Sequence, residues 1–282
     1  MNVANSLELI NQLAKENSEM CCSKQDIELL LLHTLDIEKN ELYRKNPKVN
    51  KVHLKEIKHL IDRRNLGEPI AYMLEKKGFW NLDLTVNQNV LIPRPETELL
   101  VEKILSLYDS KPLRLLDLGT GSGAIGLSLL SERPSWEVYC SDLSFHALKV
   151  AQENKKNYAI NVQLINSDWL SAFKCNSFDI IVSNPPYVDR EDNRLLGDGV
   201  SYEPLEALVS MEKGLMDLRH IIKHSKEYLK DSGCLLVEHA PEQSEEVIAL
   251  FKDYSYTSIR LFKDLNGDDR VSFGTILSLI HI

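Results

Sequence analysis

Residues 113–132 read LRLLDLGTGSGAIGLSLLSE, and this stretch decides the class of fold. Its first apolar run is too short for a typical helix and is typical of a buried strand. Glycines follow at alternate positions, Gly119, Gly121 and Gly123, before a second apolar run with helical spacing. Glycines in such a turn let the backbone approach a ligand at the N-terminus of the next helix. The stretch therefore predicts a strand, a ligand-binding turn and a helix.

The same alternation continues to the C-terminus. Further strand-like runs are EVYCSD, VQLI, FDIIVS and GCLLVEH, and the helix-like runs between them include SFHALKVAQENKKN and LMDLRHIIKHSKEYL. Strands that alternate with helices predict a mostly parallel sheet, whose ligands bind at the carboxyl ends of the strands. The last two runs, YTSIRLFKD and RVSFGTILSL, predict an antiparallel hairpin added at the sheet edge.

The N-terminal part of the chain has a different pattern. Residues 1–75 show only amphipathic helical spacing, with Ser23 as an expected N-cap and Asp26 three residues later. Residues 76–92 alternate apolar and polar side chains, which predicts a short hairpin. PRPETE then breaks the chain before a helix. We expect a small all-α domain at 1–75, a hairpin linker at 76–92 and an α/β domain at 93–282.

Composition narrows the class of protein further. The chain has 282 residues, 43% of them hydrophobic, and a net charge of −9 from 33 basic and 42 acidic residues. It has neither a signal-peptide pattern at the start nor an apolar run of about 18 residues. We therefore expect a cytoplasmic protein that makes no membrane contact. The five cysteines and eight histidines have no ligand spacing, so no metal site is expected.

One stretch departs from the acidic average. Between Arg44 and Arg64 the chain carries eight Lys or Arg residues against Glu56 and Asp62. Such a stretch is either a solvated helix face or a weak contact for RNA or an acidic surface. Both interpretations remain open on sequence grounds.

Carboxylates follow the second and third expected strands. Asp142 comes about 20 residues after the glycines, where a carboxylate holds ribose hydroxyls in dinucleotide folds; it could instead cap the next helix. Asp168 could accept from an adenine amine while Trp169 covers the ring, or the pair could form a surface turn. With the glycine turn, these residues predict a nucleoside-binding groove.

The fourth expected strand ends in the segment Asn184-Pro185-Pro186-Tyr187, abbreviated here as the NPPY segment. Asn184 offers an amide donor and a carbonyl acceptor, and Pro185 lacks an N–H, so its carbonyl can face a ligand. Tyr187 can stack on a flat group. The alternative is a turn with an aromatic plug. Beside a nucleoside groove, the segment predicts a platform for a flat nitrogen group.

These motifs resemble the class I methyltransferases that bind S-adenosylmethionine, with the NPPY variant of those that methylate a nitrogen on an sp² system. The chain is most similar to the release factor glutamine methyltransferases of the HemK/PrmC type. GEPIAY at 67–72, LIPRPETE at 91–98 and YEPLEAL at 202–208 carry this closer resemblance, together with the helical N-terminal module. It covers nearly the whole chain, apart from the unfamiliar tail LSLIHI at 277–282.

The resemblance implies roles for individual residues. The residues that would bind S-adenosylmethionine are Asp117, Gly119, Thr120, Gly121, Ser122, Gly123, Asp142, Asp168, Trp169 and Asn184. The residues that would bind the substrate amide are Asn184, Pro185, Pro186 and Tyr187, and all but Pro186 would be catalytic. The helical module would help to dock the release factor.

The implied reaction is methylation of the side-chain amide nitrogen (N5) of the glutamine in the Gly-Gly-Gln motif of class I release factors. One alternative is a methyltransferase for an exocyclic amine of DNA or RNA, which the net charge of −9 disfavours. A nicotinamide dehydrogenase is disfavoured by the glycine spacing. A non-catalytic S-adenosylmethionine-binding module is the remaining alternative, because a fold does not guarantee activity.

Overall fold

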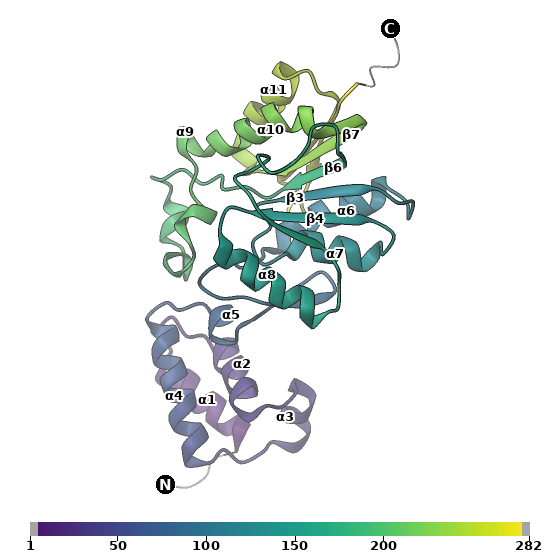
Figure 1. The fold of residues 1–282 in the computed structure, drawn as a ribbon. Coiled ribbons are helices and arrows are strands. Elements are labelled where there is room, and N and C mark those ends of the chain that lie inside the picture. The colour runs from purple at the N-terminus through teal and green to yellow at the C-terminus, as the bar shows by residue number, and fades with distance from the viewer. Residues whose placement is uncertain (1–4, 278–282) are drawn as a thin grey trace. The chain divides into compact units, whose positions relative to one another are not determined.

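The computed structural model describes residues 5–277, which form two compact units (Figure 1). Within these residues, the helical unit contains residues 5–76 together with Asp198–Tyr202, and the α/β unit contains Lys77–Gly197 and residues 203–277. Within residues 5–277, none of the helices combines the length and apolar character that crossing a membrane requires.

The helical unit is built from short amphipathic helices around one hydrophobic cluster. They are α1 (Ser6–Glu16), α2 (Lys24–Leu35), α3 (Lys39–Lys45), α4 (Lys51–Asn65) and α5 (Ile70–Met73). Leu13, Ile27 and Ile57 are among its fully covered residues. Ser23 accepts from the Asp26 N–H and the Asp26 carboxylate accepts from the Ser23 N–H, so the expected N-cap is confirmed as a capping box.

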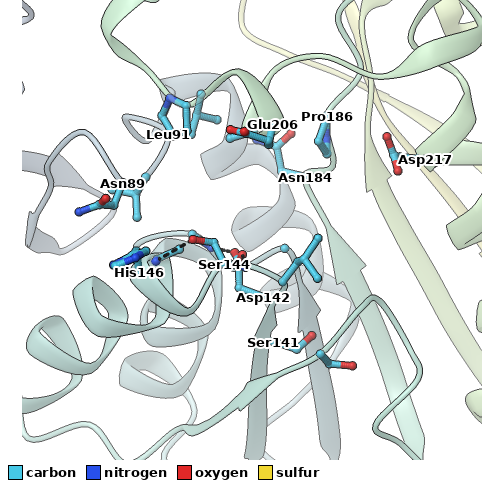
Figure 2. A pocket seen from close by; sticks show the side chains of 18 of the residues that line it. Asn89, Leu91, Ser141, Asp142, Ser144, His146, Asn184, Pro186, Glu206 and Asp217 are labelled. Carbon is cyan, nitrogen blue, oxygen red and sulfur yellow. Dashed lines mark hydrogen bonds between the residues drawn. The ribbon is translucent and has the colours of Figure 1, made fainter.

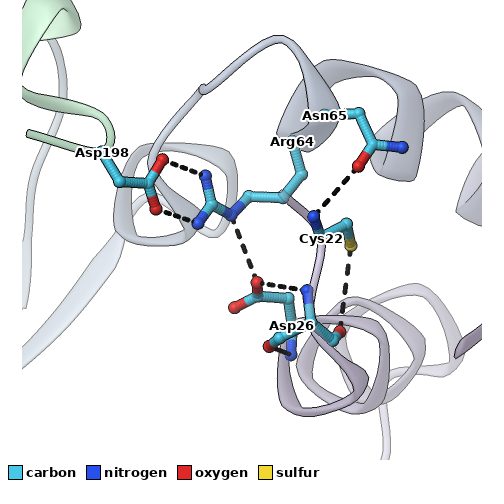
Figure 3. Close-up of polar contacts among 6 residues, drawn as sticks. Cys22, Asp26, Arg64, Asn65 and Asp198 are labelled. Atoms are coloured by element: carbon cyan, nitrogen blue, oxygen red, sulfur yellow. Dashed lines mark hydrogen bonds and ion pairs between the residues drawn. The ribbon is translucent and has the colours of Figure 1, made fainter. Parts of the chain in front are cut away.

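A buried arginine fixes the segment 198–202 within the helical unit. The guanidinium of Arg64 donates to both carboxylate oxygens of Asp198 and to Asp26 (Figure 3). Arg64 is 8% exposed. A bidentate arginine–carboxylate pair of this kind specifies geometry as well as contributing energy.

The α/β unit is organised around a seven-stranded sheet in the order β5-β4-β3-β6-β7-β9-β8. The strands are β3 (Arg114–Leu118), β4 (Glu137–Asp142), β5 (Gln163–Asn166), β6 (Phe178–Ser183), β7 (Leu229–Glu238), β8 (Thr257–Lys263) and β9 (Asp269–Thr275). The first five run parallel, and β9 pairs antiparallel with β7 and β8. This confirms the expected mostly parallel sheet with a C-terminal antiparallel hairpin. A separate two-stranded sheet joins β1 (Lys76–Phe79) to β2 (Leu82–Thr85).

Alternate residues of the central strands enter two different hydrophobic clusters. In β6, Ile180 and Val182 belong to one cluster and Ile181 to the other. The helices are α6 (Glu98–Leu107), α7 (Ala124–Glu132), α8 (Phe145–Asn157), α9 (Met211–Gly214), α10 (Met216–Tyr228) and α11 (Ser244–Asp253). Residues of α6 and α7 join the first cluster, and residues of α10 and α11 join the second. Both faces of the sheet are therefore covered, as parallel sheets require.

Some boundaries differ from the sequence-based expectation. The strand β7 begins at Leu229, four residues before the apolar run that predicted it, and β9 ends at Thr275 rather than near residue 279. The helix α11 was not expected, although Val247, Leu250 and Phe251 form its buried face. Of the unfamiliar tail, residues 278–282 lie outside the described residues.

Candidate active site

A pocket of about 710 Å³ lies at the carboxyl ends of β3, β4, β5 and β6. The chain order switches between β3 and β6, which is where open α/β sheets bind ligands. Its volume falls within the range of small-molecule sites. Seven residues with an expected role line it, namely Gly119, Gly121, Asp142, Asp168, Trp169, Asn184 and Pro186. Segments far apart in sequence thus meet at one cavity (Figure 2).

The glycine turn forms one wall of this pocket. Gly119 has φ +70° and Gly121 has φ +56°, in the left-handed region that side chains disfavour. A Cβ at Gly119 would lie 3.6 Å from the ring of Trp169, whereas a Cβ at Gly121 would meet open space. The backbone of the turn therefore borders the cavity directly.

Asp142 connects the glycine turn with the start of α8. Its carboxylate accepts from the Gly121 N–H at 2.9 Å and from the Ser144 N–H at 2.8 Å. The helix cap itself is Ser144, whose Oγ accepts from Ala147 N–H, so the alternative role of Asp142 as the cap is wrong. Burial raises the pKa of Asp142, while the two backbone donors oppose that rise.

Asp117, expected among the cofactor-binding residues, lies beneath the glycine turn, so its contact with the cofactor stays a prediction. Its side chain is fully buried beneath the turn, where Oδ2 accepts from Thr120 Oγ1 at 2.5 Å and from the Gly126 N–H at 3.1 Å. A Cβ at Gly126 would lie 2.2 Å from Cys140 Sγ, so only glycine fits there. Burial raises the pKa of Asp117 to about 7. Asp117 therefore shapes the turn and is not among the residues that line the pocket.

Asp168 and Trp169 follow β5 on the adjacent wall. Both line the pocket, and Trp169 adopts a left-handed backbone conformation with φ +42°. Its ring lies close to Gly119 and 6.5 Å from the ring of His220. The indole thus covers one side of the cavity beside the glycine turn.

The NPPY segment is held at several points as it leaves β6. Ser183 Oγ donates to the Leu118 carbonyl at 2.7 Å, and Asn184 Nδ2 donates to Thr97 Oγ1 at 3.0 Å. Gln243 Nε2 donates to the Tyr187 carbonyl at 3.0 Å. Gly214 (φ +83°) lies so close that a Cβ there would be 2.1 Å from the Tyr187 oxygen. The segment is therefore a fixed edge of the pocket.

Tyr187 lies behind this edge rather than in the pocket lining. Its hydroxyl donates to Glu238 Oε1 at 2.9 Å and its ring packs against the cluster that contains Ile181. Burial raises the pKa of Tyr187 well above its usual value. Other residues with expected roles that do not line the cavity are Thr120, Ser122, Gly123 and Pro185. Stacking of Tyr187 on a substrate stays a prediction.

Several pocket residues were not expected from the sequence. Residues 88–91 come from the segment after β2, and Glu206 comes from the YEPLEAL motif. Figure 2 places Leu91 and Glu206 near Asn184, opposite Asp142 and Ser144. Motif membership was the available signal for Glu206 and for Leu91, the first residue of LIPRPETE, whereas no local pattern marks residues 88–90.

The sheet order, the glycine turn at its switch point and the NPPY edge together define a class I methyltransferase. Residues 95–197 match the family described as methyltransferase small domain, and residues 11–74 match the PrmC N-terminal domain. The structure also resembles that of a methyltransferase from Pyrococcus furiosus, with a TM-score of 0.54 and 17% identity over 78% of this chain and 98% of that one. Among the described residues, no cluster of His, Cys, Asp or Glu is suited to a metal ion.

Curated relatives identify the particular family. A release factor glutamine methyltransferase from Buchnera aphidicola subsp. Acyrthosiphon pisum is 46% identical over 222 residues, 78% of this chain and 79% of the relative. The enzyme of the same description from Salmonella typhimurium is 40% identical over 270 residues, 95% of this chain and 96% of the relative. The chain belongs to the release factor glutamine methyltransferase family.

Proposed function

We propose that the protein transfers a methyl group from S-adenosylmethionine to the side-chain amide nitrogen of the glutamine in the Gly-Gly-Gln motif of class I release factors. The observation that carries this proposal is that Asn184 lines the same pocket as Gly119, Asp142 and Asp168, with its amide held by Thr97. A planar acceptor and a nucleoside-type groove thus share one cavity.

The residues present fit the cofactor. Gly121 borders open space, Asp142 supplies a carboxylate for ribose hydroxyls, and Asp168 with Trp169 supplies an acceptor and an aromatic face for adenine. About 710 Å³ is enough volume for such a molecule together with a side-chain amide. When bound, S-adenosylmethionine supplies a methyl group already activated on a sulfonium, so no metal is required.

The protein's own contribution is to orient a poor nucleophile. An amide nitrogen is weakly nucleophilic because its lone pair is delocalised into the carbonyl. Asn184 Oδ1 and the Pro185 carbonyl accept from the two N–H groups of the glutamine, which aims the nitrogen and stabilises positive charge as it develops. Pro185 suits this role because it has no N–H and a fixed φ. The sulfonium leaves as a neutral thioether, and the methylated nitrogen loses one proton to water.

The helical unit is proposed to help dock the release factor. Its basic stretch is less available for a partner than the sequence suggested, because Lys45 pairs with Glu41 and Arg63 pairs with Glu68. Arg64 is buried against Asp198 and Asp26. An RNA or acidic-surface contact would rest on the five remaining exposed side chains, Arg44, Lys48, Lys51, Lys55 and Lys58.

Mass spectrometry of a purified release factor incubated with the enzyme and S-adenosylmethionine tests the proposal. We expect one added methyl group on the Gly-Gly-Gln glutamine, and no addition when that glutamine is replaced by alanine. Ribosomal RNA and DNA, incubated in parallel with radiolabelled cofactor, distinguish the nucleic-acid alternative. Label in RNA or DNA with none in the release factor would overturn the proposal, as would cofactor binding without transfer.

A further inference from the structure

Three segments of the α/β unit contribute to the acceptor side of the pocket. They are residues 91–97, 184–188 and 203–210, together called here the acceptor frame. Each segment supplies residues that line the pocket, among them Leu91, Asn184 and Glu206. Figure 2 shows these three residues near one another. The relative placement of the three segments therefore determines the shape of the acceptor side.

Hydrogen bonds join the segments of the acceptor frame in a closed circuit. Asn184 Nδ2 donates to Thr97 Oγ1 at 3.0 Å, which connects the second segment with the first. The Val188 N–H donates to the Leu208 carbonyl at 2.9 Å, which connects the second segment with the third. The remaining junction, between the third segment and the first, is made by Glu203.

Glu203 uses both carboxylate oxygens for this junction. Oε1 accepts from Arg94 Nη2 at 2.5 Å, and Oε2 accepts from the Ile92 N–H at 3.0 Å. The side chain of Glu203 is 2% exposed, whereas that of Arg94 is 34% exposed. One buried carboxylate thus holds the backbone and a side chain of residues that lie 111 and 109 positions earlier in the chain.

We infer that Glu203 and Arg94 are positioning residues, which close the acceptor frame and hold Asn184 and the wall beside it in place for the substrate amide. This inference deepens the proposed function and rests on it for the identity of the substrate. On one side of the ion pair, the Thr97 N–H donates to the Arg94 carbonyl at 3.1 Å, and Thr97 holds Asn184. On the other side, Pro204 follows Glu203 directly and lines the pocket.

The burial of Glu203 makes this junction specific. Charge-assisted hydrogen bonds are stronger than neutral ones, and a buried carboxylate that loses its partner is left unpaired at a high cost. Other arrangements of the two segments are therefore disfavoured. An ion pair that served stability alone would leave the kinetic constants of the folded enzyme unchanged, whereas a positioning pair controls them.

Steady-state kinetics of methyl transfer to a release factor provide the first test, with folding of each variant checked by circular dichroism. Glu203→Gln keeps the shape and an acceptor for the Ile92 N–H but removes the charge that pairs with Arg94. We expect kcat/KM for the release factor to fall about 10-fold, through a lower kcat and a higher KM. The dissociation constant of S-adenosylmethionine should stay within about 3-fold, because the hydrogen bonds of the glycine turn are untouched.

Substitutions of Arg94 leave the buried carboxylate in place. Arg94→Met should lower kcat/KM at least as much as Glu203→Gln, because it leaves the carboxylate unpaired. Arg94→Lys restores a cation and should recover part of that loss. Arg114→Met is the matched control, since Arg114 Nε donates to Glu137 at 2.5 Å where β3 and β4 begin, at the opposite edge of the sheet. It should keep the wild-type kinetic constants.

A double-mutant cycle shows whether the two residues act as a pair. In the Arg94→Met background, Glu203→Gln should lower kcat/KM by less than about 2-fold, because the ion pair is already broken. Losses that multiply in full would overturn the inference. So would wild-type kinetics in both single variants, or an Arg94→Lys variant no more active than Arg94→Met.

A spectroscopic measurement does not require the release factor. The side-chain NH₂ resonances of Asn184, assigned by their loss in Asn184→Ala, should shift in Glu203→Gln and in Arg94→Met but not in Arg114→Met. Resonances that stay unchanged in the first two variants would refute the inference. A wild-type enzyme that methylates no release factor would refute the proposed function instead, and the NMR result would still decide the positioning.

Discussion

The two halves of the pocket are constructed by different means. On the cofactor side, the turn from Gly119 to Gly123 is held largely through its main chain, by Gly121 N–H to Asp142 and Thr120 N–H to the Ser141 carbonyl. On the acceptor side, the NPPY segment is held mainly by side chains that reach it from other elements, among them Thr97 and Gln243.

This difference determines what each half should tolerate. A turn made of backbone depends on the absence of side chains, so added atoms cost folding free energy or cofactor affinity. An edge held by side-chain hydrogen bonds depends on donors and acceptors, so their removal costs turnover. Substitutions in the two halves should therefore separate into effects on binding or stability and effects on kcat.

The largest effect is expected on the acceptor side. Asn184→Ala removes the acceptor for the substrate N–H and should lower kcat by roughly 100-fold or more. The dissociation constant for S-adenosylmethionine, measured by calorimetry, should stay within about 3-fold of the wild type because the glycine turn is untouched. Normal turnover on a release factor would remove Asn184 from the reaction.

On the cofactor side, Gly126→Ala tests the steric argument. The new Cβ would lie 2.2 Å from Cys140 Sγ, and overpacking of this kind costs about 1–3 kcal/mol of unfolding free energy. Urea denaturation measures the loss. Adding Cys140→Ala removes the obstructing sulfur and should recover part of it. If Gly126→Ala and the double variant lose the same unfolding free energy, the contact with Cys140 is not the cause of the destabilisation.

Much of this architecture could be predicted from the sequence because local patterns carry it. The strand EVYCSD was located at 137–142 and is β4, since its apolar run and flanking polar residues leave little choice. The carboxyl ends of β3, β4, β5 and β6 were expected to hold the site because parallel strands place these ends at one edge.

The remainder depended on tertiary context. Asp117 could not be separated from the other turn residues on sequence grounds, because only the folded structure shows that its side chain is buried and accepts from Thr120 and Gly126. Thr97 was overlooked, although it stands in the quoted PRPETE segment. Only its hydrogen bond with Asn184, 87 residues away in the chain, connects it with the pocket.

A smaller effect is expected for Asp142→Asn. The substitution removes the negative charge that accepts from Gly121 and Ser144 and would hold the ribose, so cofactor affinity should fall about 10-fold. Calorimetry measures the dissociation constant, and kcat at saturating cofactor should change little. The comparison between the two halves breaks down if kcat falls while the dissociation constant is unchanged.

The smallest effect concerns the pH dependence of stability on the cofactor side. The pKa of Asp117 is raised to about 7 in the folded protein, against about 3.9 in an unfolded chain. Between these values the folded state retains a proton that the unfolded state has lost, so this group's contribution to stability is complete below about pH 4 and declines as pH rises toward 7.

Asp117→Asn should therefore make the fall of unfolding free energy between pH 5 and pH 7 shallower, by at most about 1.4 kcal/mol per pH unit. Urea denaturation at several pH values measures how steeply the unfolding free energy of the wild type and of Asp117→Asn changes with pH. Glu238, whose pKa is also raised, contributes in the same direction. Because it is present in both proteins, its contribution cancels in the difference between the two slopes. Equal slopes would mean that Asp117 is ionised beneath the turn. Two of its hydrogen bonds, from Thr120 and Gly126, would then stabilise a buried charge, and the backbone-built half of the pocket would depend on electrostatics as much as the other half does.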